Sequence, residues 1–409
     1  ANEENEMVEN VAVSPATGMD VAFTNAEGIY TMNLPTEENY VITPEKDDDL
    51  LNGVSTYDLV LMSRHILEIE LLDSPYKIIA ADVNNSGDKP TTFDIVELRK
   101  VILFINDEFP DNTSWRFIDA DYVFPNPANP FEQVFPESYP INGLTGDMAD
   151  LDFVAVKIGD VNGSAQTNGF ASDAEGRDFT GRLDLNVEDI QLSEGESRFV
   201  EVKAGDFQNI MGYQFTMTFE GVEVLDVIPG VLPSMAIDNF GLQHLPQGML
   251  TCSWNSVEAL SLSPETVLFT LELKAKRDLL VSDALRISSQ LTAAEAYAEE
   301  LGNIGLKEVH FVFRNGDQVL NEDSFELYQN RPNPFKDETI IAFDLPQKGE
   351  AALTVYDLSG RILTKVSKTF DKGYNEVSIQ KADLSGAGVF YYELSTPQHT
   401  AIRKMTLIE

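Results

Sequence analysis

The sequence predicts a mainly β, multidomain chain that carries one small α-helical module. Two stretches, residues 179–315 and 325–409, consist of short runs in which apolar and polar residues alternate, as in Tyr213, Phe215 and Met217. A period of two is typical of strands with one buried face. A third stretch, residues 46–163, instead carries apolar residues at helical spacing. The length of 409 residues is enough for two to four domains.

The composition excludes some classes of partner. The chain has 68 acidic and 28 basic residues, a formal net charge of −40. A surface this acidic repels nucleic acid and anionic lipid headgroups and attracts cations. The single cysteine, Cys252, leaves no intramolecular disulfide, and its strand-like surroundings predict a buried thiol. No run approaches the roughly 20 apolar residues of a transmembrane helix.

Residues 1–45 are expected to form the C-terminal part of a β-sandwich. Residues 23–35 are typical of a strand, a turn and a strand, and residues 40–43 of a further strand. So short a segment buries too little surface to be stable alone. It resembles the small sandwich modules of the carboxypeptidase-regulatory-like and adhesin B-type families. Because the first residues lack the basic start and apolar core of a signal peptide, we expect the chain to be a fragment of a larger protein.

An internal repeat dominates residues 46–163. Residues 56–67 align with residues 92–103 at an offset of 36, and Thr56 and Asp58 recur as Thr92 and Asp94. Apolar residues at helical spacing predict one amphipathic helix in each copy, and the two helices can bury their apolar faces on each other.

Two further segments complete this module. Residues 106–139 are rich in proline and aromatic residues, in which disordered segments are depleted. We therefore expect an ordered coat packed over the helices, with an aromatic sugar-binding platform as the alternative. Residues 153–158 predict an apolar strand or helix.

An acidic, glycine-containing loop precedes each predicted helix. Calcium takes six to eight oxygen ligands, which alternating positions of a roughly twelve-residue loop can supply. The first loop fits at positions one, three and twelve, but Leu51 at position five has no side-chain oxygen and the glycine falls one place late. The second loop fits at positions one, three, five and six, but its closing acid falls one place late. The candidate metal ligands are Asp47, Asp49, Gly53, Ser55, Asp58, Asp82, Asn84, Ser86, Asp88 and Asp94, and Asp160 and Asn162 repeat the Asp-x-Asn pattern further along.

This duplicated loop–helix pair resembles a dockerin module, in which each of two calcium loops precedes a helix and position twelve is Asp. The resemblance implies calcium as the cofactor of both loops. The alternative is that Asp58 and Asp94 cap their helices, because carboxylates are stabilised at the positive N-terminal end; Ser55 and Thr56 could do the same. Asp160 and Asn162 either complete a site or form a turn.

Two segments that are typical of linkers, residues 164–178 and 316–324, flank a long strand-rich stretch. Residues 179–315 predict a two-sheet sandwich. Within it, residues 203–219 resemble cohesin-like modules. Because cohesins bind dockerins, this resemblance implies a cohesin–dockerin contact within one chain or between chains.

Residues 325–409 predict another small β-sandwich, whose leading loop holds Pro332 and Pro334, prolines that cannot donate backbone hydrogen bonds. The segment contains Asn-Arg-Pro-Asn-Pro-Phe at 330–335, Tyr-Asp-Leu-Ser-Gly-Arg at 356–361 and Gly-Val-Phe-Tyr-Tyr at 388–392. It resembles the C-terminal sorting domain of the type IX secretion system of Bacteroidetes; the alternative is a spacer domain. The resemblance implies export across the outer membrane, to the outside or to a cell-surface anchor, through the translocon and its shuttle and sortase-like proteins.

The expected function is recognition and not catalysis. The sequence holds no Gly-x-Ser-x-Gly elbow, no phosphate-binding Gly-Lys loop and no His-Glu-x-x-His, so we expect no enzyme in this chain. We expect the C-terminal region of a large secreted, cell-surface, adhesin-like multimodular protein. The alternatives are accessory modules of a carbohydrate-active enzyme, with a glycan as partner, or a scaffold assembled by cohesin–dockerin pairing.

Overall fold

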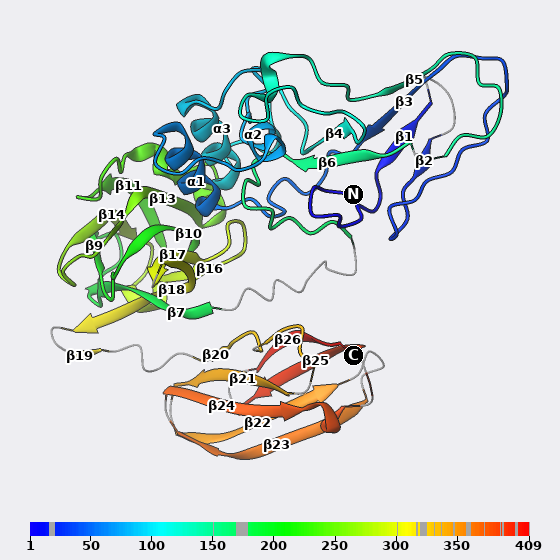
Figure 1. The fold of residues 1–409 in the computed structure, drawn as a ribbon. Helices are drawn as coiled ribbons and strands as arrows, with labels where there is room; N and C mark the ends of the chain where they lie inside the picture. Colours follow the sequence, from blue (N-terminus) through cyan, green and yellow to red (C-terminus); the bar gives the residue numbers. More distant parts are fainter. Residues whose placement is uncertain are drawn as a thin grey trace.

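A computed structural model of the chain describes residues 1–15, 21–149, 151–168, 179–300, 302–315, 318–319, 325–330, 332–336, 338–346, 348–356, 361–371, 373–384, 386, 388–396 and 400–408. The described residues are mostly β and form several sheets, as predicted (Figure 1). Most of the two predicted linkers, and residues 357–360 of the second tail motif, lie outside the described residues. Within the described ranges, no helix has the length and apolar character needed to cross a membrane.

Residues 1–45 share a sheet and a core with the aromatic segment that follows the helices. Strands β1 (Ala12–Ser14), β2 (Ala22–Phe23), β3 (Tyr40–Glu45) and β5 (Tyr139–Ile141) pair in the order β2-β1-β3-β5. Tyr40 and Ile42 of β3 are buried in one cluster with Trp115 and Phe117. The sheet and the core therefore cross the boundary predicted at residue 45, and the short segment obtains its missing core from residues 115–165.

The helical module, residues 46–163, contains both predicted helices, α1 (Thr56–Ile66) and α3 (Thr92–Ile102). They pack on each other, and a short helix that the pattern did not predict, α2 (Pro75–Ala80), lies between them in sequence. Strands β4 (Trp115–Asp119) and β6 (Phe153–Lys157) form a two-stranded sheet, so residues 153–157 are a strand. The aromatic segment is an ordered coat, because its rings are packed into the cores: Phe109, Trp115, Phe117, Phe124 and Phe135 are buried.

The large sandwich, residues 179–315, is built from strands, as predicted, but most of them pair into one continuous sheet and not into the two separate sheets expected. Its main sheet has the order β11-β14-β9-β7-β18-β17-β10-β13-β12, in which only β7 and β18 run parallel among the described pairs. Cys252 of β13 is fully buried, as expected. The strands are β7 (Phe179–Glu188), β8 (Gln191–Leu192), β9 (Ser197–Ala204), β10 (Ile210–Phe219), β11 (Val222–Pro229), β12 (Phe240–Gly241), β13 (Met249–Leu260), β14 (Val267–Ala275), β15 (Leu279–Leu280), β16 (Leu285–Ser288), β17 (Glu295–Glu300) and β18 (Asn303–Asn315), with the short helix α4 (Val281–Ala284) before β16 and β19 (Gln318–Val319) paired with β18.

The tail sandwich, residues 325–409, has two sheets of order β20-β21-β24 and β23-β22-β25-β26. In β21, Ile341, Phe343 and Leu345 face the core and Ile340 is exposed, as the alternating pattern predicts. Phe335 of the leading loop is buried in the same core. The strands are β20 (Glu326–Leu327), β21 (Glu338–Leu345), β22 (Gly349–Tyr356), β23 (Ile362–Phe370), β24 (Gly373–Gln380), β25 (Gly388–Ser395) and β26 (Thr400–Leu407).

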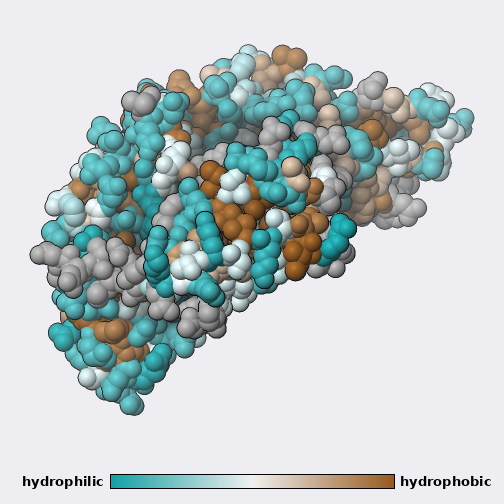
Figure 2. All heavy atoms as spheres, turned by 90° about the horizontal axis from the view of Figure 1, so that it is seen from below, coloured by the Kyte–Doolittle hydropathy of each residue, from teal (hydrophilic) through white to brown (hydrophobic). Residues whose placement is uncertain are grey.

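The surface seen from below is largely hydrophilic, with apolar groups gathered in a few patches between polar side chains (Figure 2). This agrees with a chain of 68 acidic residues, most of which remain in water because an unpaired buried carboxylate is costly. The buried acids are therefore the informative ones. Four lie in the helical module, and these are Asp58, Asp82, Asp94 and Asp160.

Candidate calcium loops and module interface

The second predicted loop brings three of its candidate ligands together. Asp82 directly follows the last turn of α2, and its Oδ1 accepts hydrogen bonds from the backbone N–H and the hydroxyl of Ser86, at 2.8 and 3.0 Å. The amide oxygen of Asn84 accepts from the same Ser86 N–H at 3.0 Å. Asp94 Oδ1 accepts from the Asn84 N–H at 3.1 Å. Two carboxylates and one amide oxygen thus converge on a single turn.

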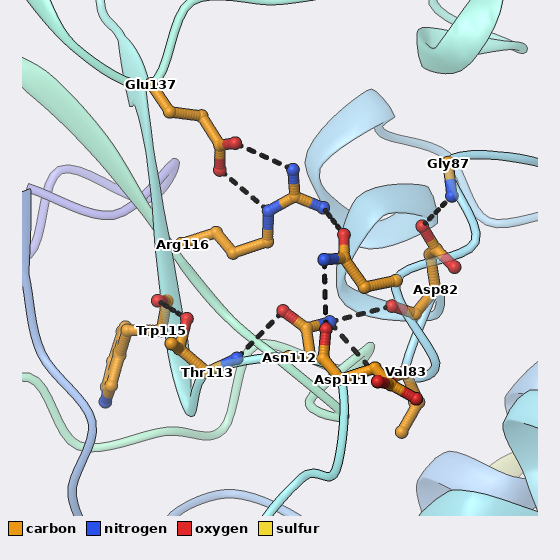
Figure 3. A network of polar contacts seen from close by, with 10 residues as sticks. Asp82, Val83, Gly87, Asp111, Asn112, Thr113, Trp115, Arg116 and Glu137 are labelled. Atoms are coloured by element: carbon orange, nitrogen blue, oxygen red, sulfur yellow. Dashed lines mark hydrogen bonds and ion pairs between the residues drawn. The ribbon is translucent and has the colours of Figure 1, made fainter.

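The outside of this loop is fixed by a polar network (Figure 3). The Asn112 side chain donates to the carbonyl oxygens of Asp82 and Val83, at 3.0 and 3.3 Å. The Arg116 guanidinium donates to Asn85 and is held by a bidentate ion pair with Glu137, at 2.7 and 2.9 Å. The loop backbone is therefore held in place from the β4 side, without any use of the Asp82 and Asp94 carboxylates.

The electrostatics of the second loop favour a cation. Burial raises the pKa of Asp82, and the neighbouring Asp94 carboxylate raises it further, against hydrogen bonds from Gly87 and Ser86 that lower it. Asp88 is exposed, and its carboxylate accepts a hydrogen bond from the backbone N–H of the next residue, Lys89, at 2.7 Å. Asp82, Asn84, Ser86 and Asp94 supply the hard oxygen atoms that calcium prefers, so this loop fits the ion.

The first loop is arranged differently. Asp47 Oδ1 accepts from the Ser114 N–H at 2.7 Å, and the Ser114 hydroxyl donates to the Asp48 carbonyl at 2.7 Å. Asp58 is fully buried: its Oδ2 accepts from the N–H and hydroxyl of Ser55, and its Oδ1 from the Val161 N–H at 3.0 Å. The acids at positions one and twelve are therefore bonded to the residue just before β4 and to the chain that follows β6.

A turn built on Asp160 covers the first loop. The Asp160 carboxylate accepts backbone N–H groups of Gly163, Ser164 and Ala165 at 2.7–3.1 Å. The Ser164 hydroxyl then donates to the Gly53 carbonyl at 2.9 Å. Asn162 lies within this turn, so the Asp-x-Asn echo forms a turn. Residues 164–166, predicted as the start of a linker, belong to this cover.

A buried basic side chain contacts the backbone of the first loop. Lys157, the last residue of β6, is 4% exposed, and its ammonium donates to the carbonyl oxygens of Leu50 and Ile158 at 3.0 and 3.3 Å. Burial lowers the pKa of Lys157 to about 8, while the carboxylates of Asp160, Asp49 and Asp58 act to raise it. Burial and the Asp160 charge raise the pKa of Asp58.

Across the described residues, no three Asp, Glu, His or Cys side chains are placed to hold a metal ion together. A calcium site in the second loop would therefore combine two carboxylates with amide, hydroxyl and backbone oxygens, which calcium accepts. In the first loop, Asp47 and Asp58 are engaged by backbone donors, Asp49 acts on the Lys157 ammonium, and Ser55 caps α1. Asp58 and Asp94 do cap their helices, in capping boxes with Ser55 and Thr91. Thr56, expected as a further cap, is the first residue of α1 and bonds to Gln214 and Ser253 instead.

The helical module docks on the large sandwich through the ends of its two helices, next to β10 and β13 (Figure 1). At the start of α1, the Thr56 N–H donates to the Gln214 side chain at 2.6 Å, and the Thr56 and Ser253 hydroxyls share a 2.6 Å hydrogen bond. At the end of α3, the hydroxyls of Thr251 and Thr292 donate to the carbonyls of Leu103 and Ile102, each at 2.6 Å. The sandwich thus supplies partners to backbone groups that helix ends leave unpaired.

Longer side chains and two glycines complete this interface. Arg99 donates to Asn255 at 2.6 Å and Arg64 to the Val257 carbonyl at 3.2 Å. A Cβ atom at Gly212 would come within 3.0 Å of Thr56, and one at Gly241 within 2.4 Å of the Leu103 carbonyl. Both glycines therefore allow the helix ends to approach the sandwich closely.

Little in the sequence marks these interface residues. Thr56 is the exception, because its identity with Thr92 marked both positions. Gln214, Thr251 and Ser253 sit in strands of ordinary alternating pattern and carry no motif. Lys157 had one visible signal, a charged residue that interrupts the apolar run 153–158.

Comparison with known proteins identifies the tail. Residues 331–408 match the family model described as a secretion system C-terminal sorting domain. The chain is therefore a secreted cargo of the type IX secretion system, exported to the cell surface or the extracellular space, and its tail interacts with that machinery. The sequence matches no curated protein.

Solved structures give only weak likenesses. They include a type I cohesin from Pseudobacteroides cellulosolvens, with 13% identity over 32% of this chain and 87% of that one and a TM-score of 0.24. A chain of a cohesin–dockerin complex from Clostridium thermocellum is 11% identical over 32% of this chain and 100% of that one, with a TM-score of 0.24. The type IX secretion component PorZ from Porphyromonas gingivalis is 13% identical over 28% of this chain and 15% of that one, with a TM-score of 0.16. TM-scores this low support no inference about the fold or the function of this chain.

The repeat offers a matched test of the interface. Thr56→Val removes a buried hydroxyl and leaves that of Ser253 without this partner, which costs about 1–3 kcal/mol. Thr92→Val changes the equivalent position of α3, which is exposed. We expect faster hydrogen exchange in α1 and β13 for Thr56→Val alone; equal effects of the two substitutions would contradict the proposed contribution of this contact.

Proposed function

We propose that the chain is the C-terminal region of a large adhesin-like surface protein, in which the helical module and the large sandwich act together as one calcium-stabilised, non-catalytic presenting unit. The tail sandwich is its export and anchoring signal. The observation that carries this proposal is the docking of α1 and α3 on the sandwich within one chain, combined with the sorting domain at the C-terminal end.

The docked arrangement favours a presenting unit over a scaffold. If the helical module is dockerin-like and the large sandwich cohesin-like, as their sequences suggest, then their pairing is already satisfied inside the chain. The contacts join residues that lie 148–197 positions apart, and the hydroxyls that make them are buried. A second chain would have to displace these hydrogen bonds before it could bind the same face of β10 and β13.

The acidic loops support calcium at one site at least. The second loop presents Asp82, Asn84, Ser86 and Asp94 around one turn, held from outside by Asn112 and Arg116. Calcium there would neutralise two buried carboxylates that face each other, which removes a cost of burying charge. It would bind without a new loop conformation having to form, so little ordering entropy would oppose it.

The carbohydrate-related alternative has less support, because the aromatic rings that it would use are packed in cores and not displayed. Phe109, Trp115 and Phe117 are each at most 5% exposed. A glycan array probed with the full chain separates the two functions. We expect no bound glycan; reproducible binding that is lost on substitution of half-buried Tyr122 or Phe131 would favour accessory modules of an enzyme.

The export role can be tested with adjacent residues of β21. Ile341 is fully buried and Ile340 is 39% exposed. Ile341→Asp buries an unpaired carboxylate and disrupts the tail sandwich, whereas Ile340→Asp places the charge at the surface. In a bacterium with type IX secretion, we expect the first variant to remain in the periplasm and the second to reach the surface, as measured by protease accessibility on intact cells. Surface exposure of both variants would argue against recognition of the folded tail.

Calcium should stabilise the helical module through the second loop. At about 100 times its Kd, a ligand that binds only the folded state adds about 2.7 kcal/mol, or roughly 10 °C in the melting temperature of a module this size. We expect the melting temperature to be higher by this amount in calorimetric scans of the full chain with calcium than in scans with a chelator. Asp94→Asn should lose it and Asp88→Asn, at an exposed position of the same loop, should keep it. An identical melting temperature with and without calcium would rule out the structural role.

A further inference from the structure

The two acidic loops differ in what they contain, although their helices are copies. The acids Asp58 and Asp94 occupy equivalent repeat positions, and each uses its Oδ2 to cap its own helix. The Oδ1 atoms differ: that of Asp94 accepts from Asn84 inside its own loop, whereas that of Asp58 accepts from Val161. The first loop is thus closed by a distant segment of chain.

That segment also carries the only buried ammonium that the described residues place in either loop. Lys157 reaches from the end of β6 and donates to the carbonyl oxygen of Leu50, the residue that follows the predicted ligand Asp49. Its neighbours are the carboxylates of Asp160, Asp49, Asp58 and Asp48, and the Phe109 ring lies 5.7 Å from its Nζ. We infer that the Lys157 ammonium, and not calcium, is the resident cation of the first loop.

The physical reason is charge and oxygen supply. Calcium in such a loop is bound by backbone carbonyls and by carboxylates that converge on it, and the ammonium already takes the Leu50 carbonyl and the field of four acids. An incoming calcium ion would meet a fixed positive charge. The Asp58 and Asp47 oxygens are also held by Val161 and Ser114, which lie outside the loop, whereas the backbone donors to Asp82 and Asp94 belong to the second loop itself. The residues of the first loop therefore do not fit the calcium that the dockerin resemblance implies.

Among the described residues, the second loop holds no buried ammonium. Lys89, the basic residue within this loop, is exposed, and Arg116 contacts Asn85 and is ion-paired with Glu137. The groups that act on Asp82 are hydrogen-bond donors and the like-charged Asp94. The chain would thus bind one calcium ion, at the second loop. This count rests on the calcium role proposed above, whereas the assignment of Lys157 does not.

The stoichiometry of calcium binding tests the first part. Titration calorimetry of the chelator-treated full chain should give one calcium ion per chain. Asp94→Asn should reduce this to none, and Asp58→Asn, the equivalent change in the first loop, should leave it at one. Two ions in the wild type, falling to one in Asp58→Asn, would overturn the assignment. Absence of binding in the wild type would overturn the calcium proposal for the second loop. The assignment of Lys157 would then be tested by the double-mutant cycle described next.

A double-mutant cycle tests the ammonium itself. Lys157→Met keeps the bulk of the side chain and leaves the surrounding carboxylates without their cation, so we expect the melting temperature to fall by roughly 6–15 °C. Asp160→Asn in the Lys157→Met background should restore part of this loss, although alone it destabilises. Additive losses would show no charge coupling and overturn the inference. If Lys157→Met does not fold, Lys157→Arg can be measured instead, because it keeps the charge. We expect this variant to have near wild-type stability both in calcium and in chelator, and a large loss of stability in either condition would count against the assignment of Lys157.

Discussion

The structure depends on one constraint: the ends of two helices are buried against a β-sheet, and buried backbone groups need partners. The first N–H groups and last carbonyls of a helix have none inside it, and leaving one unsatisfied costs about 1–3 kcal/mol. Here Gln214 accepts at the start of α1, while Thr251 and Thr292 donate at the end of α3. These short hydrogen bonds fix the position and the direction of the helix pair on the large sandwich.

The loops inherit their shape from these fixed helices. Each loop ends in an aspartate at the third helical position, where one carboxylate oxygen caps the helix and the other is free for a different partner. Asp58 and Asp94 therefore make the same cap and differ only in Oδ1. A duplicated sequence has in this way produced one loop that the later strand β6 closes and one that remains self-contained, with no change in the helices themselves.

The sequence predicts the parts of this structure that are periodic and little of what joins them. Helical spacing located α1 and α3, and alternation located β10 and β21, because each pattern extends over ten or so residues. Helix α2 has six residues and β5 has three, too few to show a period. The interface partners Gln214 and Thr251 and the ammonium of Lys157 are single polar residues more than 100 positions from what they touch, and no local signal encodes such a pairing. The tail was found because its motifs are specific.

The buried acids of the helical module show how an acidic exported chain can fold. A formal net charge of −40 opposes compaction, and every buried carboxylate must be hydrogen-bonded or paired. Asp160 meets this need with three backbone N–H groups of its own turn, and the first loop with an ammonium from the same chain. Neither arrangement needs an ion from the solvent. Under the proposed calcium role, the second loop, where the Asp94 charge acts on the buried Asp82, would gain from an ion in solution, and extracellular modules bind calcium with a Kd of about 10⁻⁴–10⁻³ M. The sorting tail delivers the chain to the outside of the cell. The proposed calcium site would therefore be completed only after export, on a module whose first loop and sandwich contacts are already in place.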